Sequence, residues 1–223
     1  MDTNKALWGR VCKTDPRHVK PITGKQYKGN SPKPYWIVER LTEEFGPCGI
    51  GWGFSILNER METLHTSILH IAVVRFWYVL DGKRGELEQI GQTIACYEKS
   101  DGSKVIVDED APKKSVTDAL VKCASYLGFA GDIFSGMWDD SKYVNDTLAE
   151  YEEKDRLAAR NAWLDETAHA LEACDTPEAL KAKWSAAVAT TKAEQDTDAY
   201  ETLKPVMERT AARIKAQKQG ATA

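Results

Sequence analysis

Apolar residues recur at helical spacing shortly after residue 33, and this pattern predicts the first long helix. The periodic positions are Ile37, Val38, Leu41 and Phe45. Pro34 suits the first turn of a helix, and Gly46-Pro47 is a stop signal. We therefore expect a helix over residues 34–45 whose apolar side packs on a sheet.

Alternating and continuous apolar stretches after residue 50 predict an antiparallel sheet. Trp52, Phe54 and Ile56 alternate with small or polar residues, as in a half-buried strand. Residues 68–80 form a nearly continuous apolar run, typical of a central strand, and further strands are predicted at 87–97 and 104–107. Turn signals separate these segments at Asp81-Gly82 and Asp101-Gly102.

A basic helix is predicted directly after the last strand, where residues 113–129 read KKSVTDALVKCASYLGF. Asp110 is placed to be its N-cap, Pro112 lies in its first turn and Gly128 ends it. The expected apolar stripe consists of Val116, Leu120, Ala124 and Leu127. The helix either packs on the core with a solvent-exposed outer face or presents positive charge to an acidic ligand.

The two ends of the chain differ from this middle part. Residues 8–33 are rich in Gly, Pro and Lys without a period, so we expect a loop there. After Trp138 the chain is rich in Ala, Glu, Lys and Leu, and breaks at Thr176-Pro177 and 194–198 predict about three helices. The expected fold is α+β: a three- to four-stranded antiparallel sheet flanked by helices, then a small helical domain. The expected division is 1–34, 35–145 and 146–223.

Composition narrows the class of protein. The chain has 223 residues, of which 42% are hydrophobic and 29% charged, as in soluble globular proteins. Its longest apolar run, residues 68–80, contains His70 and Arg75 and is too short to cross a bilayer. The N-terminus shows no signal-peptide pattern, and five dispersed cysteines suggest reduced thiols in a cytoplasm. We expect no metal site and no cofactor.

Charge is distributed unevenly along the chain. The formal net charge is −4, but residues 1–35 carry eight Lys or Arg and two Asp, a charge of +6. Residues 146–223 carry eleven basic and fifteen acidic side chains, a charge of −4. A basic segment of this kind is typical of proteins that bind nucleic acid, which the net charge alone would hide.

Two alternatives remain open on the residues alone. Asp132, Asp139, Asp140 and Lys142 include the carboxylates that a Mg²⁺-dependent nuclease would use, although a capping and solvated-turn role explains them better, because adjacent Asp139 and Asp140 point in different directions. The third class is a non-enzymatic interaction protein that acts through its helical tail. Gly49, Gly51 and Gly53 lie between a helix and a strand, the wrong order for a G-x-G-x-x-G nucleotide loop. The sequence contains no P-loop motif, so ATP-driven recombination is not expected.

Several motifs, taken in order, resemble the Rad fifty-two family of single-strand annealing proteins, especially its phage members. The basic helix carries Lys-Lys-Ser-Val-Thr-Asp-Ala-Leu at 113–120, then Lys122 and Leu127-Gly128, which is similar to the family's helix. FGPCGIGWGFSI at 45–56 is similar to the entry into the family's first strand, and Asp81-Gly82 with Gly91 is a third likeness. APKKSVTDAL and MWDDSKYV resemble phage members, and the likeness covers roughly residues 8–145.

The resemblance implies an ATP-independent protein of DNA recombination and repair that binds single-stranded DNA and anneals complements, without enzymatic activity. It further implies a bacteriophage origin, a homo-oligomeric ring or filament, and a host single-strand binding protein or a phage exonuclease as a partner of residues 146–223. Each basic residue alone is better explained as a solvated surface residue, but together they predict a phosphate-binding groove. The candidates are Lys20, Lys25, Lys28, Lys33, Arg75, Lys83, Arg84, Lys113, Lys114 and Lys122.

The chain departs from the family on the basic helix. Eukaryotic members carry several basic residues after the Asp-Gly-Leu motif, whereas Val121 and Ser125 occupy two of those positions here. Of the family's basic positions after this motif, the one occupied by Lys122 is also basic in this chain. We therefore expect the N-terminal lysines to supply the remaining charge.

Overall fold

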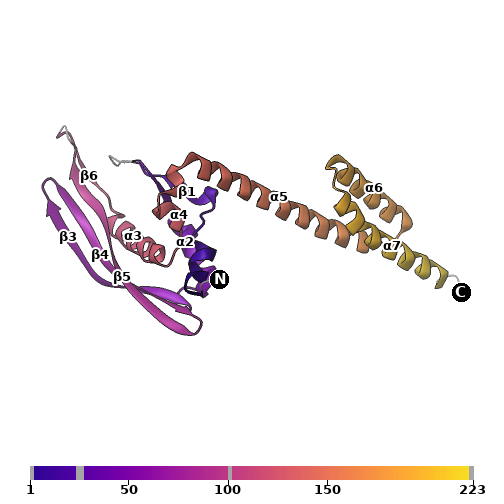
Figure 1. Cartoon of the computed structure of the whole chain (residues 1–223), viewed down its shortest axis with the longest axis horizontal. Helices are drawn as coiled ribbons and strands as arrows, with labels where there is room; N and C mark the ends of the chain where they lie inside the picture. The colour runs from indigo at the N-terminus through magenta and orange to yellow at the C-terminus, as the bar shows by residue number, and fades with distance from the viewer. Residues whose placement is uncertain (1–2, 24–27, 100–101, 221–223) are drawn as a thin grey trace. The chain divides into compact units, whose positions relative to one another are not determined.

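The structure is a computed structural model that describes residues 3–23, 28–99 and 102–220. The chain divides into two compact units, Met1–Leu148 and Ala149–Ala223. The first combines a sheet with helices and the second is helical (Figure 1), which confirms the predicted α+β class. Among the described helices, none combines the length and the apolar character needed to cross a membrane.

Four antiparallel strands form the main sheet in the order β3-β4-β5-β6. Their bounds are Trp52–Leu64, Ser67–Leu80, Lys83–Glu98 and Val105–Val107. Asp81 and Gly82 both have positive φ and close the β4–β5 hairpin, as the Asp-Gly signal predicts. The predicted turn residue Asp101 lies outside the described residues. β3 has only one neighbour, so its outer edge is unpaired within the described sheet.

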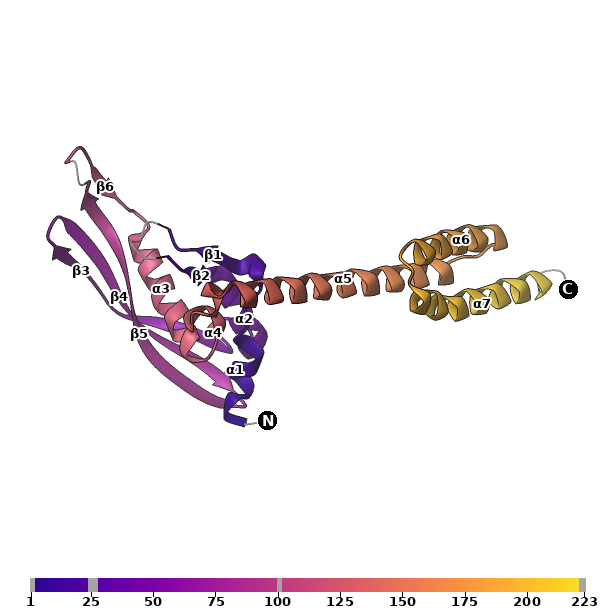
Figure 2. The same cartoon turned by 45° about the horizontal axis from the view of Figure 1, so that its top comes forward.

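Helix α3 (Ala111–Tyr126) lies along the concave side of the curled sheet (Figure 2). Its buried face consists mainly of small residues four apart, Ala111, Ser115, Ala119 and Cys123. The predicted stripe was partly right: Ala124 is buried, and Leu120 and Leu127 are half-buried against the core, but the prediction left out the small residues that form most of the buried face. Gly91 explains the difference, because a Cβ at this position on β5 would lie 1.9 Å from the Ser115 carbonyl oxygen. Helix and sheet approach so closely here that only small side chains fit between them.

Helix α2 (Pro34–Phe45) has the predicted bounds and ends at Gly46, whose φ is +94°. Its buried residues, including Ile37 and Leu41, join a core with Trp52, Phe76 and Phe129. The helix contacts β3, β4 and α3, so it completes the layer on the concave side of the sheet. The prediction that its apolar side packs on a sheet is confirmed.

The N-terminal segment is structured, so the prediction of a loop over residues 8–33 was wrong. It contains α1 (Ala6–Val11), two short 3-10 turns (Thr3–Lys5 and Pro16–His18) and a two-stranded sheet of β1 (Val19–Pro21) and β2 (Asn30–Pro32). Val11 is fully buried in the core of the first unit. A Cβ on Gly128 would meet the Trp8 ring at 2.8 Å, so α1 packs closely on that turn. Residues 1–34 thus belong to the same unit as the sheet.

A buried carboxylate holds the segments that follow α3. Asp132, in α4 (Gly131–Phe134), is 3% exposed and accepts five hydrogen bonds. The donors are the amide and hydroxyl of Thr14 at 2.9 and 2.6 Å, the Ile133 amide at 2.8 Å, and Trp138 Nε1 and the Tyr143 hydroxyl at 2.9 Å each. Burial, then the bond to Asp132, strongly raises the pKa of Tyr143. Asp132 therefore ties the N-terminal segment to α4, η3 (Met137–Asp139) and the start of α5.

Three helices follow over residues 141–220, as predicted. Helix α5 (Ser141–Glu172) begins in the first unit and continues into the second, which also contains α6 (Pro177–Ala193) and α7 (Thr197–Gly220). The second unit has its own core around Leu171, Leu180, Leu203 and Ile214. The boundary falls after Leu148, within a continuous helix, rather than at the predicted residue 145.

Candidate nucleic-acid interface

The two lysines at the start of α3 are paired with carboxylates. Lys113 Nζ lies 3.0 Å from Asp110, and Lys114 Nζ lies 2.6 Å from Asp108. The hydrogen bond from Lys113 lowers the pKa of Asp110. Asp110 occupies the predicted N-cap position, but its side chain makes no capping bond to the helix backbone and contacts Lys113 instead. Positive charge at this end of the helix is largely compensated.

Lys122, near the other end of α3, has aromatic neighbours instead. Its Nζ lies 5.2 Å from the ring centre of Phe134 and 5.8 Å from that of Tyr126. Both rings are strongly exposed, Tyr126 at 60% and Phe134 at 44%. No carboxylate partner of Lys122 is found among the described residues. We call Lys122, Tyr126 and Phe134 the Lys122 platform: an ammonium group between two exposed rings.

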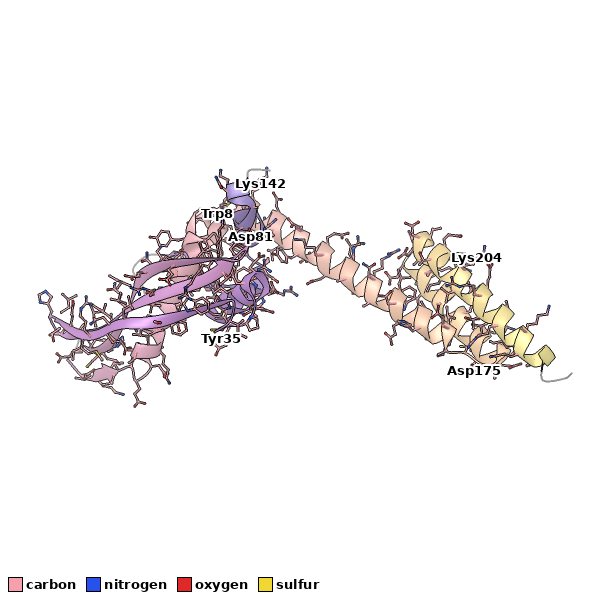
Figure 3. The ribbon with its side chains drawn as sticks, turned by 90° about the horizontal axis from the view of Figure 1, so that it is seen from below. Trp8, Tyr35, Asp81, Lys142, Asp175 and Lys204 are labelled. Atoms are coloured by element: carbon pink, nitrogen blue, oxygen red, sulfur yellow. The ribbon has the colours of Figure 1, made fainter. Side chains whose placement is uncertain are left out.

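The N-terminal lysines lie on and around the β1–β2 hairpin. β2 packs against α4, the helix that carries Phe134, and the Asn30 side-chain amide lies 3.4 Å from the Trp138 carbonyl oxygen. Lys20 and Lys28 are exposed on this hairpin, whereas Lys25 lies outside the described residues. Lys33, just before α2, donates a 2.8 Å hydrogen bond to the Arg17 carbonyl oxygen. Beside it, Tyr35 projects from the first turn of α2 (Figure 3) and is 87% exposed.

The predicted arginines lie on the other face of the sheet. Arg75 alternates with Val74 and Phe76, which are fully buried on the α3 side, so it points away from α3. It forms a 2.7 Å ion pair with Glu88, which raises the pKa of Arg75. Arg84 pairs with Glu86 at 2.8 Å and stacks 4.4 Å above the Trp77 ring.

The sheet therefore separates the predicted groove residues. Lys83 is exposed at the start of β5, next to the tip of the β4–β5 hairpin, and Arg75 and Arg84 lie on the face opposite α3. Of the described candidates outside α3, Lys20 and Lys28 lie on the β1–β2 hairpin, which adjoins the Lys122 platform through α4. One groove cannot use Arg75 and Lys122 together, because the sheet and α3 lie between them.

The acidic residues considered for a nuclease have different environments. Asp132 is buried and already accepts five hydrogen bonds, so it is a structural residue rather than part of a solvated turn. Asp139 and Asp140 are exposed, and Asp140 accepts a 2.8 Å hydrogen bond from the Lys142 amide at the start of α5. Within the described residues, no group of three or more His, Cys, Asp or Glu side chains is arranged to hold a metal ion.

The aromatic members of the Lys122 platform were missed in the sequence. Tyr126 follows Lys122 by four residues, which places the two side chains on the same face of a helix. This spacing in the sequence could therefore have identified Tyr126 as a neighbour of Lys122. Phe134 gave no such signal, because it lies beyond the turn at Gly128, and its distance from Lys122 depends on the position of α4.

Comparison with protein-family models and with curated proteins does not identify a relative of the chain. No protein-family model matches the chain, and no curated protein matches it with significance.

Proposed function

We propose that the first unit binds single-stranded DNA and anneals complementary strands without ATP. The observation that carries this proposal is the Lys122 platform, which combines an uncompensated ammonium group with two exposed aromatic rings. The motif order resembling single-strand annealing proteins supports the same function, since Lys122 is the basic position shared with that pattern.

The chemistry of the platform suits this task. An ammonium group binds any phosphate, and an aromatic ring stacks with any base, so neither contact selects a sequence. Stacking of one or two bases also leaves their hydrogen-bonding edges free to test a complement. Lys20 and Lys28, on the hairpin that packs against α4, extend the positive surface beyond the platform.

A single platform offers few contacts, so the proposal includes a homo-oligomer, either a ring or a filament, in which the surface repeats. The unpaired edge of β3 supports this part. It carries Phe54, Ile56 and Met61, each at least 40% exposed. An apolar unpaired strand edge is a typical place for another chain to add its own strand.

The second unit, in this proposal, serves a partner of the DNA reaction, either the host single-strand binding protein or a phage exonuclease. Its separate core supports an independent role. Naked DNA should then be annealed by a 1–150 fragment about as well as by the full chain. DNA coated with single-strand binding protein should require the full chain, and equal activity of the fragment on coated DNA would contradict this assignment.

The direct test of the proposed function is an annealing assay with two complementary labelled oligonucleotides and the full chain. Annealing should proceed equally with and without ATP. The same reaction with Mg²⁺ and one strand alone should leave that strand intact. Cleavage would favour the nuclease alternative, and a protein that neither binds nor anneals would favour a pure interaction protein.

A further inference from the structure

The second unit contains a groove between α6 and α7 with an apolar floor. It has a volume of about 590 Å³, and Leu180, Trp184 and Ile214 contribute to its floor. Trp184 is partly buried, and its ring lies 5.4 Å from that of Tyr200, which limits its movement. The volume is within the range of ligand-binding clefts, and the floor is large enough for several bulky side chains.

The rim of this groove has the opposite charge from the rest of the unit. Lys181, Lys215 and Lys218 line the groove, and no Asp or Glu lines it among the residues that the structure describes. Residues 146–223 nevertheless carry a net charge of −4. Lysine stems add apolar surface next to the floor while the ammonium groups stay in solvent. Basic rim and apolar floor are therefore concentrated at one place on an otherwise acidic unit.

We propose that this groove binds an acidic, amphipathic helical segment of a partner protein. Apolar side chains at helical spacing would fill the floor, and carboxylates on their flanks would face Lys181 and Lys215. DNA is not the expected occupant, because its bases would need to enter an apolar cleft while the acidic remainder of the unit repels its phosphates. The inference rests on the proposed partner role of the second unit, but not on DNA binding by the first.

The probe is a labelled peptide of about sixteen residues with Leu and Phe at positions i, i+3, i+4 and i+7 and Glu elsewhere. Its binding to the full chain is measured by fluorescence anisotropy. A second peptide replaces every Glu with Lys, and a third keeps the composition but scatters the apolar residues. The acidic amphipathic peptide should bind saturably, and both others should bind at least about tenfold more weakly.

Protein variants locate the site. The double variant Lys181→Glu/Lys215→Glu should weaken the acidic peptide at least about tenfold. Lys192→Glu is the matched control, because Lys192 is an exposed lysine of α6 outside the groove, and it should change affinity less than about twofold. Circular dichroism checks that both variants are folded. Equal binding of the three peptides, no saturable binding, or equal effects of the two variants would overturn the proposal.

A DNA-binding measurement on the same variants separates this inference from the proposed function. Lys181→Glu/Lys215→Glu should bind single-stranded DNA as the unaltered chain does. If peptide binding fails while DNA is still bound, only the groove assignment is wrong. If the peptide binds but no DNA does, the groove assignment stands and the DNA-binding proposal fails.

Discussion

The two ends of helix α3 differ although both carry lysine. At its start, Lys113 and Lys114 each contact a carboxylate within 3.0 Å. Toward its end, Lys122 lies between two exposed aromatic rings. A phosphate approaching the first end competes with an aspartate already in place, whereas Lys122 has no carboxylate partner among the residues that the structure describes. The number of basic residues therefore says less about a binding surface than their partners do.

The largest effect is expected from Asp132, which holds one side of the Lys122 platform in place. Asp132→Ala removes the acceptor of the Thr14 amide and hydroxyl, of Trp138 Nε1 and of the Tyr143 hydroxyl, and each buried donor left unsatisfied costs about 1–3 kcal/mol. We expect the free energy of unfolding of the first unit to fall by about 3 kcal/mol or more. Denaturant unfolding followed by tryptophan fluorescence measures this change.

Asp139→Ala is the matched control for Asp132, because Asp139 is exposed on the neighbouring turn. It should change the free energy of unfolding by less than about 0.5 kcal/mol. A change below about 1 kcal/mol for Asp132→Ala would mean that its hydrogen bonds do not hold the segments together.

The second prediction removes the rings and keeps the charge. Tyr126→Ala combined with Phe134→Ala should weaken binding of an oligothymidine strand by about tenfold, since stacking of one base contributes about 1–3 kcal/mol. Both rings are exposed, so the melting temperature should change little. Anisotropy of a labelled strand gives the affinity. Unchanged affinity in the folded double variant would exclude stacking on this platform.

Tyr97→Ala is a suitable control for the aromatic variant. Tyr97 is also exposed, at 41%, but it lies on β5 near the far end of the sheet and outside the platform. Its removal should leave affinity within about twofold. Equal losses in both variants would indicate diffuse aromatic binding rather than a defined site.

The sequence predicts the elements that local signals determine, but not those that depend on contacts between distant residues. The helix at 34–45 and the β4–β5 hairpin follow from local signals, namely apolar period and Asp-Gly, and both are confirmed. The prediction failed for residues 8–33, because β1 and β2 are stabilised by pairing with each other and α1 by packing on Gly128. Such contacts between distant residues leave no periodic pattern.

The candidate site shows the same limit. Lys122 was predicted from a local motif, and its exposure on α3 agrees with that prediction. The apolar stripe of α3 was only partly predicted, because the burial of its small residues depends on Gly91, a residue of another element. Phe134 joins the platform through the position of α4, which Asp132 fixes by bonds to residues as distant as Thr14. Periodicity alone contains none of this information.

A smaller effect is expected in the second unit, where a charged pair connects α5 to the start of α7. The hydrogen bond from Arg160, 2.9 Å from Nη2 to Oδ1, lowers the pKa of Asp196 to about 2. An unfolded Asp titrates near 3.9, so the contribution of the pair is present above about pH 4 and disappears as the pH falls toward 2. Asp196→Asn should lower the melting temperature slightly at pH 7 and not at pH 2.

Melting of the full chain followed by circular dichroism at several pH values tests this prediction. Asparagine can still accept the hydrogen bond from the Ala199 amide, so the variant removes charge and keeps the cap. A difference between the two proteins that persists unchanged down to pH 2 would contradict the assigned role of the charge.

The comparison between the two ends of α3 is tested most directly by salt dependence of single-strand binding in Lys122→Ala and Lys113→Ala. Both substitutions remove one exposed lysine from the same helix. Lys122→Ala should reduce the magnitude of the slope of log K against log salt by about 0.7, the value for one phosphate contact. Lys113→Ala should leave the slope unchanged, because Asp110 already compensates that charge. Equal slopes for the two variants, or a loss confined to Lys113→Ala, would contradict the assignment of the DNA-binding surface to the Lys122 platform.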